Sequence, residues 1–466
     1  MYNDADITLV YTELTEAARE CIRSNQYGKF REISEKLNFA DTAELLEDEF
    51  EKSGEASAVR LFRMLPKSIA AEVFSFFDVT VQQRLITVLS TQEATEIMND
   101  MYADDLKDML EEMPANVVHK LLKNTESDMR RAVNMLLRYS DDSAGSIMTV
   151  EFLSLTAKST VREAIERIRN EGIDKETVNT CFVLGENRML AGTITLRKLI
   201  LSAENRVISD IMETNPVYVS TDTDQEEVAD IFQKYDLTSM PVVDSEQRLV
   251  GIITIDDVVD IIREEATEDM EKMAAITPSE RPYLRTGVFR TYVQRIPWLL
   301  LLMLSATVTA GIIQNYEAAL AACVALTAFV PMLTDTGGNS GSQASVTVMR
   351  GLSLNEIEFR DILKVVFKEF RVGVLCGITL GVANFIKMIV LNVGKNGVTL
   401  AVAGVISVTL CVTVVIAKIV GCSLPILAKK LRFDPAVMAS PIITTLVDAL
   451  ALVVYFSIAT ALLGLN

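Results

Sequence analysis

The chain has 466 residues, enough for several domains, and a formal net charge of −19. Residues 293–466 carry 12 Lys and Arg against 8 Asp and Glu, whereas residues 1–292 carry 32 against 55. An apolar part of charge +4 and an acidic part of charge −23 argue against nucleic acid as a partner and favour a cation. One histidine and six cysteines without metal-ligand spacing argue against a zinc site, and the N-terminus lacks the features of a signal peptide.

Residues 1–140 have a helical pattern. Segments such as AAEVFSFF, VQQRLITVLS and DLKDMLEEM place apolar residues three and four apart, with polar punctuation between them. Short helices that recur in this way stack and bury one continuous core. We therefore expect a small helical superhelix.

Residues 141–262 alternate strands with helices and contain an internal repeat. Ile147–Thr149 (IMT) recurs as Ile211–Glu213 (IME), and Gly192–Thr195 (GTIT) recurs as Gly251–Thr254 (GIIT). The two units resemble a tandem pair of CBS domains, the second through YDLTSMPVVD and LVGIITIDDVVDII. We expect these α/β domains at residues 141–202 and 203–262.

The CBS resemblance implies an adenine nucleotide, such as ATP, as a ligand. Such pairs often bind it through a Gly-x-x-Thr-x-x-Asp stretch, which the second copy keeps as Gly251, Thr254 and Asp257. The first copy has Lys198 at the position of the aspartate. The other interpretation is that the CBS pair serves only in dimerisation and sensing.

Residues 263–292 are expected to form an acidic connecting helix. Eight carboxylates and one arginine lie between Asp256 and Glu271, and Pro278 and Pro282 end the helical pattern. A run of like charges is usually a solvated face. This run joins a sensor-like module to a membrane, which is where a control element is required.

From residue 293 onward the chain is expected to form a transmembrane domain of five helices. Stretches of roughly 20 apolar residues can cross a bilayer. We expect spans at about 296–314, 319–349, 370–391, 398–424 and 436–463. Basic residues lie in the loop between spans two and three, in the loop between spans four and five, and before span one. This distribution predicts cytosolic N-terminal domains and an external C-terminus.

The second span contains a polar, glycine-rich stretch, FVPMLTDTGGNSGSQ. We expect a helix that breaks at Pro331, with irregular backbone through Gly337, Gly338 and Asn339. Such backbone is tolerated at membrane depth only where protein covers it or it lines a watery cavity. The alternative is a close helix contact that glycines permit.

The last span contains one carboxylate, Asp448, among apolar neighbours. A carboxylate inside a membrane segment is a functional-site hypothesis. Thr444 lies one helical turn before it, with Thr445 beside Thr444 and Ser440 further back. An all-oxygen lining suits hard cations such as Mg²⁺, and two facing Asp448 side chains on a twofold axis would favour a divalent ion.

The order of these parts resembles the MgtE family of magnesium channels, as do the motifs PMLTDTGGNSGSQ and DPAVMASPIITTLVD. The resemblance implies a homodimeric Mg²⁺ channel of the cell membrane with its pore at the dimer axis. It implies Asp448 as the ion-binding carboxylate. Together with the polar pattern, it suggests a pore lining of Pro331, Gly337, Gly338, Asn339, Ser440, Thr444 and Thr445.

The resemblance also implies that cytosolic Mg²⁺ binds acidic domain interfaces and closes the pore through the connecting helix. The matching positions are Glu72, Asp104, Asp108, Asp224, Glu226, Asp236, Asp257, Asp260, Glu265, Glu268, Asp269 and Asp434. Crowded carboxylates repel until a divalent ion screens them, so Mg²⁺ would shift the population to a closed state.

Three departures from the family pattern affect the expected pore. Ser440 replaces a common asparagine, Ala449–Ala451 replaces a Gly-containing run, and Asp335 adds a carboxylate. A carrier for Co²⁺ or Mn²⁺ and a nucleotide-responsive membrane-anchored sensor are the alternative functions. No nucleophile, phosphate-loop or acid–base motif predicts an enzyme.

Overall fold

The computed structural model describes the chain except residues 1–3, 112, 280–282, 395–397, 439 and 465–466. The chain divides into two compact units, Met1–Ile262 and Arg263–Asn466.

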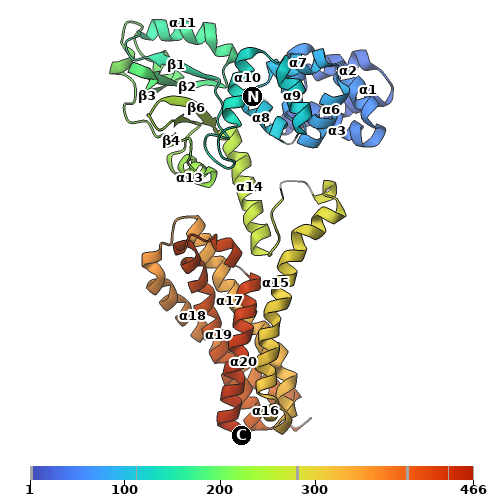
Figure 1. The fold of residues 1–466 in the computed structure, drawn as a ribbon, viewed down its shortest axis with the longest axis vertical. Coiled ribbons are helices and arrows are strands. Elements are labelled where there is room, and N and C mark those ends of the chain that lie inside the picture. The colour runs from blue at the N-terminus through green and yellow to red at the C-terminus, as the bar shows by residue number, and fades with distance from the viewer. Residues whose placement is uncertain (1–3, 112, 280–282, 395–397, 439, 465–466) are drawn as a thin grey trace. The chain divides into compact units, whose positions relative to one another are not determined.

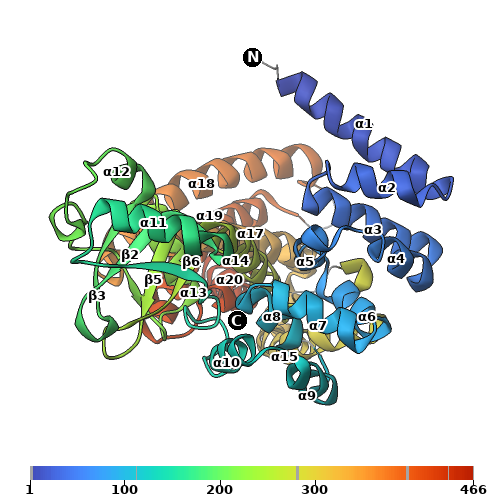
Figure 2. The same ribbon diagram turned by 90° about the horizontal axis from the view of Figure 1, so that it is seen from above.

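The described part of the first unit begins with ten helices (Figure 2). Eight of them stack in two rows, one with α3, α5, α7 and α9 and the other with α4, α6, α8 and α10. They are α1 (Asp4–Arg23), α2 (Tyr27–Ser34), α3 (Phe39–Ser53), α4 (Glu55–Phe62), α5 (Lys67–Ser75), α6 (Val79–Val88), α7 (Thr91–Asp100), α8 (Ala103–Glu111), α9 (Ala115–Asn124) and α10 (Ser127–Leu136). Local sequence signals mark the start of several of these helices, such as the capping box of Ser90 and Glu93 at α7. The predicted helical N-terminal domain is confirmed.

Two similar three-stranded sheets follow. The first contains β1 (Phe152–Thr156), β2 (Thr177–Leu184) and β3 (Leu190–Thr195), with α11 (Val161–Glu171) and α12 (Leu196–Ile200). The second contains β4 (Val219–Ser220), β5 (Ser239–Val243) and β6 (Leu249–Thr254), with α13 (Gln225–Tyr235) and α14 (Ile255–Met273). In each sheet the first two strands are parallel and the last two antiparallel. The predicted repeat is therefore a structural repeat.

The repeated sequence motifs meet in space, each with the other copy. Thr149 pairs with Ile252 of β6, and Glu213 pairs with Thr193 of β3. A Cβ on Gly251 would overlap the side chain of Met148, and a Cβ on Gly192 would overlap the backbone of Glu213. Each motif glycine therefore permits the close approach of a strand to the partner motif.

The second unit is helical (Figure 1). It contains the end of α14, η4 (Tyr283–Arg285), α15 (Val288–Asn315), α16 (Glu317–Ala322), η5 (Val324–Phe329), α17 (Val330–Ser353), η6 (Phe359–Asp361), α18 (Ile362–Leu391), α19 (Leu400–Lys430), η7 (Pro435–Met438) and α20 (Ser440–Leu463). Among the described residues, four helices are long and apolar enough to cross a membrane: Val288–Asn315, Phe359–Leu391, Leu400–Lys430 and Pro441–Leu463. The predicted second span, which contains most of α17, is not one of these four.

The predicted connecting helix differs from the observed element. α14 begins at Ile255, inside the second sheet domain, and ends at Met273, where Ala275 takes a left-handed conformation. The helix thus covers only part of residues 263–292.

The prediction of a broken α17 is wrong. α17 is continuous through Gly337, Gly338 and Asn339, and the irregular backbone lies before it, in η5. Pro331 occupies the first turn, where its missing N–H and fixed φ are tolerated. Packing of α17 against α19 and α20 compensates for the low helix propensity of the glycines.

Candidate ion pathway and regulatory carboxylates

Glycines hold α17 close to α19 and α20. A Cβ on Gly338 would lie 2.8 Å from Thr444 Cγ2, and one on Gly337 would lie 2.9 Å from Thr413 Cγ2. A Cβ on Gly341 would lie 3.0 Å from Ile443 Cγ2. Gly337 and Gly338, which are predicted as pore lining, are buried packing positions in the single chain. Small residues let membrane helices approach closely.

A separate, exposed face of α17 carries a polar stripe, which we define as Asp335, Asn339 and Gln343. These side chains are four residues apart, so they share one helix face, and all three are exposed in the single chain. The Asn339 amide donates a hydrogen bond to Asp335 Oδ1 at 3.2 Å. Pro331 is also exposed, at the start of the helix. Of the predicted α17 lining, Asn339 and Pro331 are therefore accessible.

Asp448 lies on α20, among the helices packed against α17. The residue is partly buried, and its Oδ1 is buried without a hydrogen-bond partner among the described residues. The Thr445 hydroxyl donates to the carbonyl of Pro441 at 2.9 Å, while Thr444 lies against Gly338. Ser440 begins α20, but its side chain lies outside the described part of the chain. The structure thus brings Thr444 and Asp448 next to α17.

A second group of carboxylates gathers in the first unit, where α8 meets the sheet domains. We call Asp104, Asp105, Glu151, Glu176 and Asp257 the interface carboxylates. They interact electrostatically with one another, and an oxygen of Asp104 and one of Glu176 are buried without hydrogen-bond partners among the described residues. Asp257 Oδ2 accepts a hydrogen bond of 2.7 Å from the Thr254 hydroxyl. The fold therefore concentrates negative charge at this place.

Burial, reinforced by the neighbouring carboxylates, raises the pKa values of these groups. The pKa of Asp257 rises to about 7, that of Glu176 to about 8 and that of Asp105 to about 6. The pKa of Asp104 rises well above its ordinary value for the same reason. Desolvation and like charges both disfavour the ionised form, which an added cation would favour.

Asp104 and Asp257 are among the residues predicted from the sequence, whereas Asp105, Glu151 and Glu176 are not. Glu151 and Glu176 precede β1 and β2, and their backbones are joined by a hydrogen bond of 2.9 Å. No local pattern distinguishes them from surface glutamates. Only the sheet topology places them beside α8.

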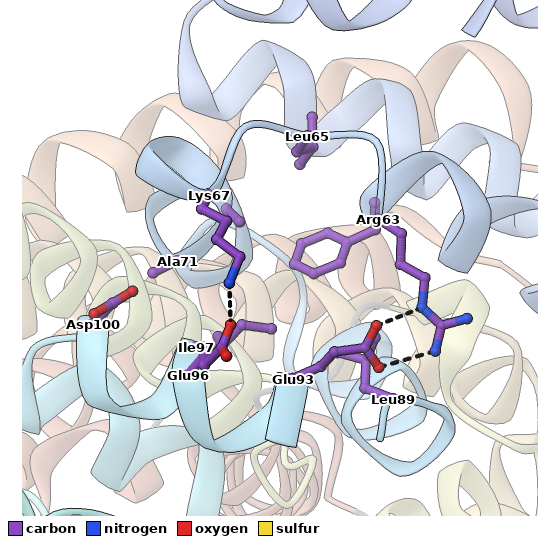
Figure 3. Close-up of a pocket in the computed structure, with 11 residues that line it drawn as sticks. Arg63, Leu65, Lys67, Ala71, Leu89, Glu93, Glu96, Ile97 and Asp100 are labelled. Carbon is purple, nitrogen blue, oxygen red and sulfur yellow. Dashed lines mark hydrogen bonds and ion pairs between the residues drawn. The ribbon is translucent and has the colours of Figure 1, made fainter. Parts of the chain in front are cut away.

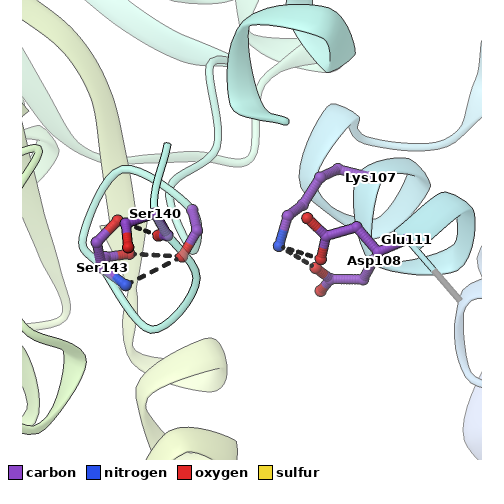
Figure 4. Close-up of polar contacts among 6 residues, drawn as sticks. Lys107, Asp108, Glu111, Ser140 and Ser143 are labelled. Carbon is purple, nitrogen blue, oxygen red and sulfur yellow. Dashed lines mark hydrogen bonds and ion pairs between the residues drawn. The ribbon is translucent and has the colours of Figure 1, made fainter. Parts of the chain in front are cut away.

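Other predicted regulatory residues of the first unit lie apart from the deepest part of this group. Asp108 is exposed and accepts a hydrogen bond of 2.9 Å from the buried Lys107, which also pairs with Glu111 at 2.9 Å (Figure 4). Asp224 caps α13 by accepting from the Glu226 backbone N–H at 2.9 Å. Glu72, Asp236 and Asp260 are exposed.

In the second unit, the end of α14 meets the segment before α20. Lys272 Nζ lies 2.7 Å from Asp434 Oδ2 and also pairs with Glu268, one turn earlier on α14. Burial lowers the pKa of Lys272, but hydrogen bonds to both carboxylates outweigh this effect and raise it. Burial and the nearby Asp434 raise the pKa of Asp269. The predicted residues Glu268, Asp269 and Asp434 therefore converge around a lysine, and Glu265 lies one turn before Asp269.

No three His, Cys, Asp or Glu side chains within the described ranges are close enough to form a metal site. The carboxylates converge without reaching coordination geometry. The predicted nucleotide-binding residues make contacts within the protein. Gly251 packs on Met148, and Asp257 is hydrogen-bonded to Thr254.

Comparisons with known proteins identify the family. A magnesium transporter MgtE from Thermus thermophilus is 36% identical over 455 residues, which are 97% of this chain and 99% of the relative. The chain belongs to the MgtE family of magnesium transporters. An MgtE transporter from Bacillus subtilis is 32% identical over 97% of this chain and 98% of its own length.

Family models match each part of this MgtE chain. The MgtE divalent cation transporter model matches residues 330–458, the MgtE intracellular N domain matches 37–142, and the CBS domain matches 144–204 and 208–264. A crystal structure of the soluble part of a magnesium transporter, 29% identical, covers 55% of this chain and 99% of its own with a TM-score of 0.51. The predicted family, the CBS pair and a transporter that is not an enzyme are confirmed. The chain is a multi-pass membrane protein with cytosolic N-terminal domains.

The intracellular N domain also contains a pocket of about 380 Å³ between α4, α5 and α7 (Figure 3). Arg63 binds both oxygens of Glu93 at 2.8 and 3.0 Å, and Lys67 lies 2.7 Å from Glu96. The hydrogen bonds from Arg63 lower the pKa of Glu93 to about 2. Because both cationic groups are neutralised by carboxylates, the pocket is not arranged to hold an anion.

Proposed function

We propose that this MgtE protein is a channel that imports Mg²⁺ and that cytosolic Mg²⁺ closes. The observation that carries the proposal is the exposed polar stripe of α17 beside Asp448 of α20. A carboxylate and amides facing lipid are costly. Such a stripe needs a water-filled pathway or a second protein surface.

A homodimer meets this need. Two copies on a twofold axis would turn both stripes and both Asp448 side chains toward one pathway. A divalent ion relieves the repulsion between the paired carboxylates, and Mg²⁺ is usually held by one or two carboxylates with several waters retained. Asp448 is therefore the proposed ion-binding residue, with Asn339, Thr444, Thr445 and Ser440 near the path.

We assign α17 as the fifth membrane span. Its 24 residues extend about 36 Å, enough for a hydrocarbon core of about 30 Å. With five spans, the C-terminus lies outside, in agreement with the basic loops. The proposed division is residues 1–140, 141–202, 203–262, 263–292 and 293–466.

The proposed gate uses the two carboxylate groups. Mg²⁺ that screens the interface carboxylates would stabilise the arrangement in which they are close, because the ion binds that state better. α14 contains Asp257 near its start and Glu268 and Asp269 near its end. The helix is therefore the proposed connection between metal binding and the pore.

The test is Mg²⁺ influx into proteoliposomes, with low and high Mg²⁺ on the cytosolic face. We expect wild-type flux that falls at high Mg²⁺ and no flux with Asp448→Asn. Glu356→Gln, which neutralises an exposed carboxylate of the same unit, is the matched control and should conduct normally. Undiminished flux in Asp448→Asn would remove Asp448 from the pathway.

Neutralising Asp257, Asp260, Glu265 and Asp269 together should leave flux intact and abolish its inhibition. The same assay with Co²⁺ and Mn²⁺ separates a Mg²⁺ channel from a carrier of other divalent ions. Absence of wild-type flux under every condition would favour the nucleotide-responsive sensor, for which ATP binding at Gly251, Thr254 and Asp257 is the direct measurement.

A further inference from the structure

The packing of α17 on α20 fixes which residues face each other. The helices are antiparallel, since Gly341 lies against Ile443, whereas the earlier Gly337 lies against the later Val447. Gly338 lies against Thr444 between these points. Each step back along α17 therefore corresponds to a step forward along α20. Asp335, three residues before Gly338, is at the level of Asp448.

Electrostatics agree with this register. The Asp335 and Asp448 carboxylates are close enough to interact with each other. Asp335 has no cationic partner in the ion pairs that the structure describes, and its polar contact is the neutral amide of Asn339. Two carboxylates therefore lie near each other in a membrane unit, and an oxygen of Asp448 is buried with no hydrogen-bond partner in the described part of the chain.

We propose that Asp335 is a second carboxylate of the ion pathway, which together with Asp448 raises the affinity for an incoming divalent cation. This inference rests on the proposed channel function and adds a specificity-determining residue to it. In the proposed dimer, two Asp335 and two Asp448 side chains would form a ring of four carboxylates at about the same depth. A hydrated divalent cation gains about twice the Coulomb energy of a monovalent one at this ring.

A helix-dipole role does not account for Asp335. The favourable effect of an acidic side chain is confined to the first turn of a helix, and Asp335 lies in the second turn of α17. Lipid exposure is also unfavourable for an ionised carboxylate. In the proposed dimer, where both stripes turn toward the twofold axis, an exposed aspartate of the polar stripe lies along the pathway.

Asp335→Asn isolates the charge, because its amide oxygen can still accept the hydrogen bond from Asn339. Mg²⁺ influx is measured over a range of external Mg²⁺, in full-length protein in proteoliposomes with low Mg²⁺ on the cytosolic face. We expect the half-saturating Mg²⁺ concentration to rise about tenfold. External salt should weaken influx more in the wild type than in the variant, since it screens the charge. Asp335→Glu, which restores the charge, should return both properties toward the wild type.

Different outcomes separate this inference from the channel itself. An unchanged half-saturating concentration in Asp335→Asn, with no flux in Asp448→Asn, would overturn the role of Asp335 alone. Normal flux in Asp448→Asn would overturn the proposed pathway. If Asp335→Asn does not conduct, recovery in Asp335→Glu supports the charge, and failure of both variants indicates a structural residue and refutes the proposal.

Discussion

Replacing Asp257 by asparagine should stabilise the first unit when divalent cations are absent. Asparagine keeps an oxygen for the Thr254 hydroxyl, which donates at 2.7 Å, and removes only the charge. Burial and neighbouring carboxylates raise the pKa of Asp257 to about 7. Its ordinary value is about 3.9. The variant therefore removes a negative charge that the folded state disfavours.

The sign of the pH dependence follows from proton binding. Between pH of about 4 and about 7, the folded chain holds more of this proton than the unfolded chain, so the free energy of unfolding falls as pH rises. At pH of about 8 the ionised group lowers that free energy by at most about 4 kcal/mol, at about 1.36 kcal/mol per pKa unit. Because Asp105 and Glu176 share the repulsion and titrate with Asp257, we expect about 2 kcal/mol.

Thermal unfolding of the full-length protein in detergent with a chelator measures this effect. About 2 kcal/mol corresponds to a Tm increase of about 4–8 °C for a unit of this size. At pH of about 4, close to the unfolded pKa, the group is largely protonated in the folded chain and about half protonated in the unfolded chain, and the difference should nearly vanish. Mg²⁺ should stabilise the wild type more than the variant, because it binds the folded carboxylates.

The matched control is Asp174→Asn, an exposed aspartate of the same unit, whose Tm should change little. A Tm for Asp257→Asn equal to or below the wild type at pH of about 8 without divalent ions would refute the reasoning. It would mean that the Asp257 charge makes a net favourable interaction.

Two further predictions concern the membrane unit. A Cβ on Gly421 would overlap the backbone of Gly341, so Gly421→Ala should destabilise the unit by about 1–3 kcal/mol in thermal unfolding. Gly404→Ala, on the same helix with no atom within 4 Å of its Cβ, should not, and equal losses would contradict this packing account. Lys272→Met removes the cation between Glu268 and Asp434, so the Mg²⁺ concentration that half-inhibits flux should rise about fivefold. Adding Asp434→Asn should partly reverse that rise, and independent effects of the two substitutions would exclude coupling through this ion pair.

The order and type of the elements could be predicted because their signals are local. The repeats Ile147–Thr149 and Ile211–Glu213 indicated two equivalent domains, and both formed the same sheet topology. The continuous α17 could not be predicted from propensity alone. Glycines disfavour an isolated helix, but Gly337, Gly338 and Gly341 gain close contacts with helices from later in the chain.

The candidate sites show the same limit. Asp448 stands out in the sequence because a lone carboxylate in an apolar span is costly. Glu151 and Glu176 do not stand out, since their burial depends on the pairing of β1 with β2 and on the position of α8. No local pattern distinguishes Lys272, and its contact with Asp434 depends on the tertiary structure.

The glycine face and polar stripe of α17 bear on how the protein enters the membrane during synthesis. α17 is not among the described helices that are apolar enough to cross on their own, and the helices that its glycines fit, α19 and α20, are translated later. A nascent chain that ends before α19 should therefore leave α17 outside the bilayer interior. Integration of this segment then waits for residues 400–463, which form α19 and α20. A premature stop codon before them would therefore affect the topology of a segment encoded upstream of it.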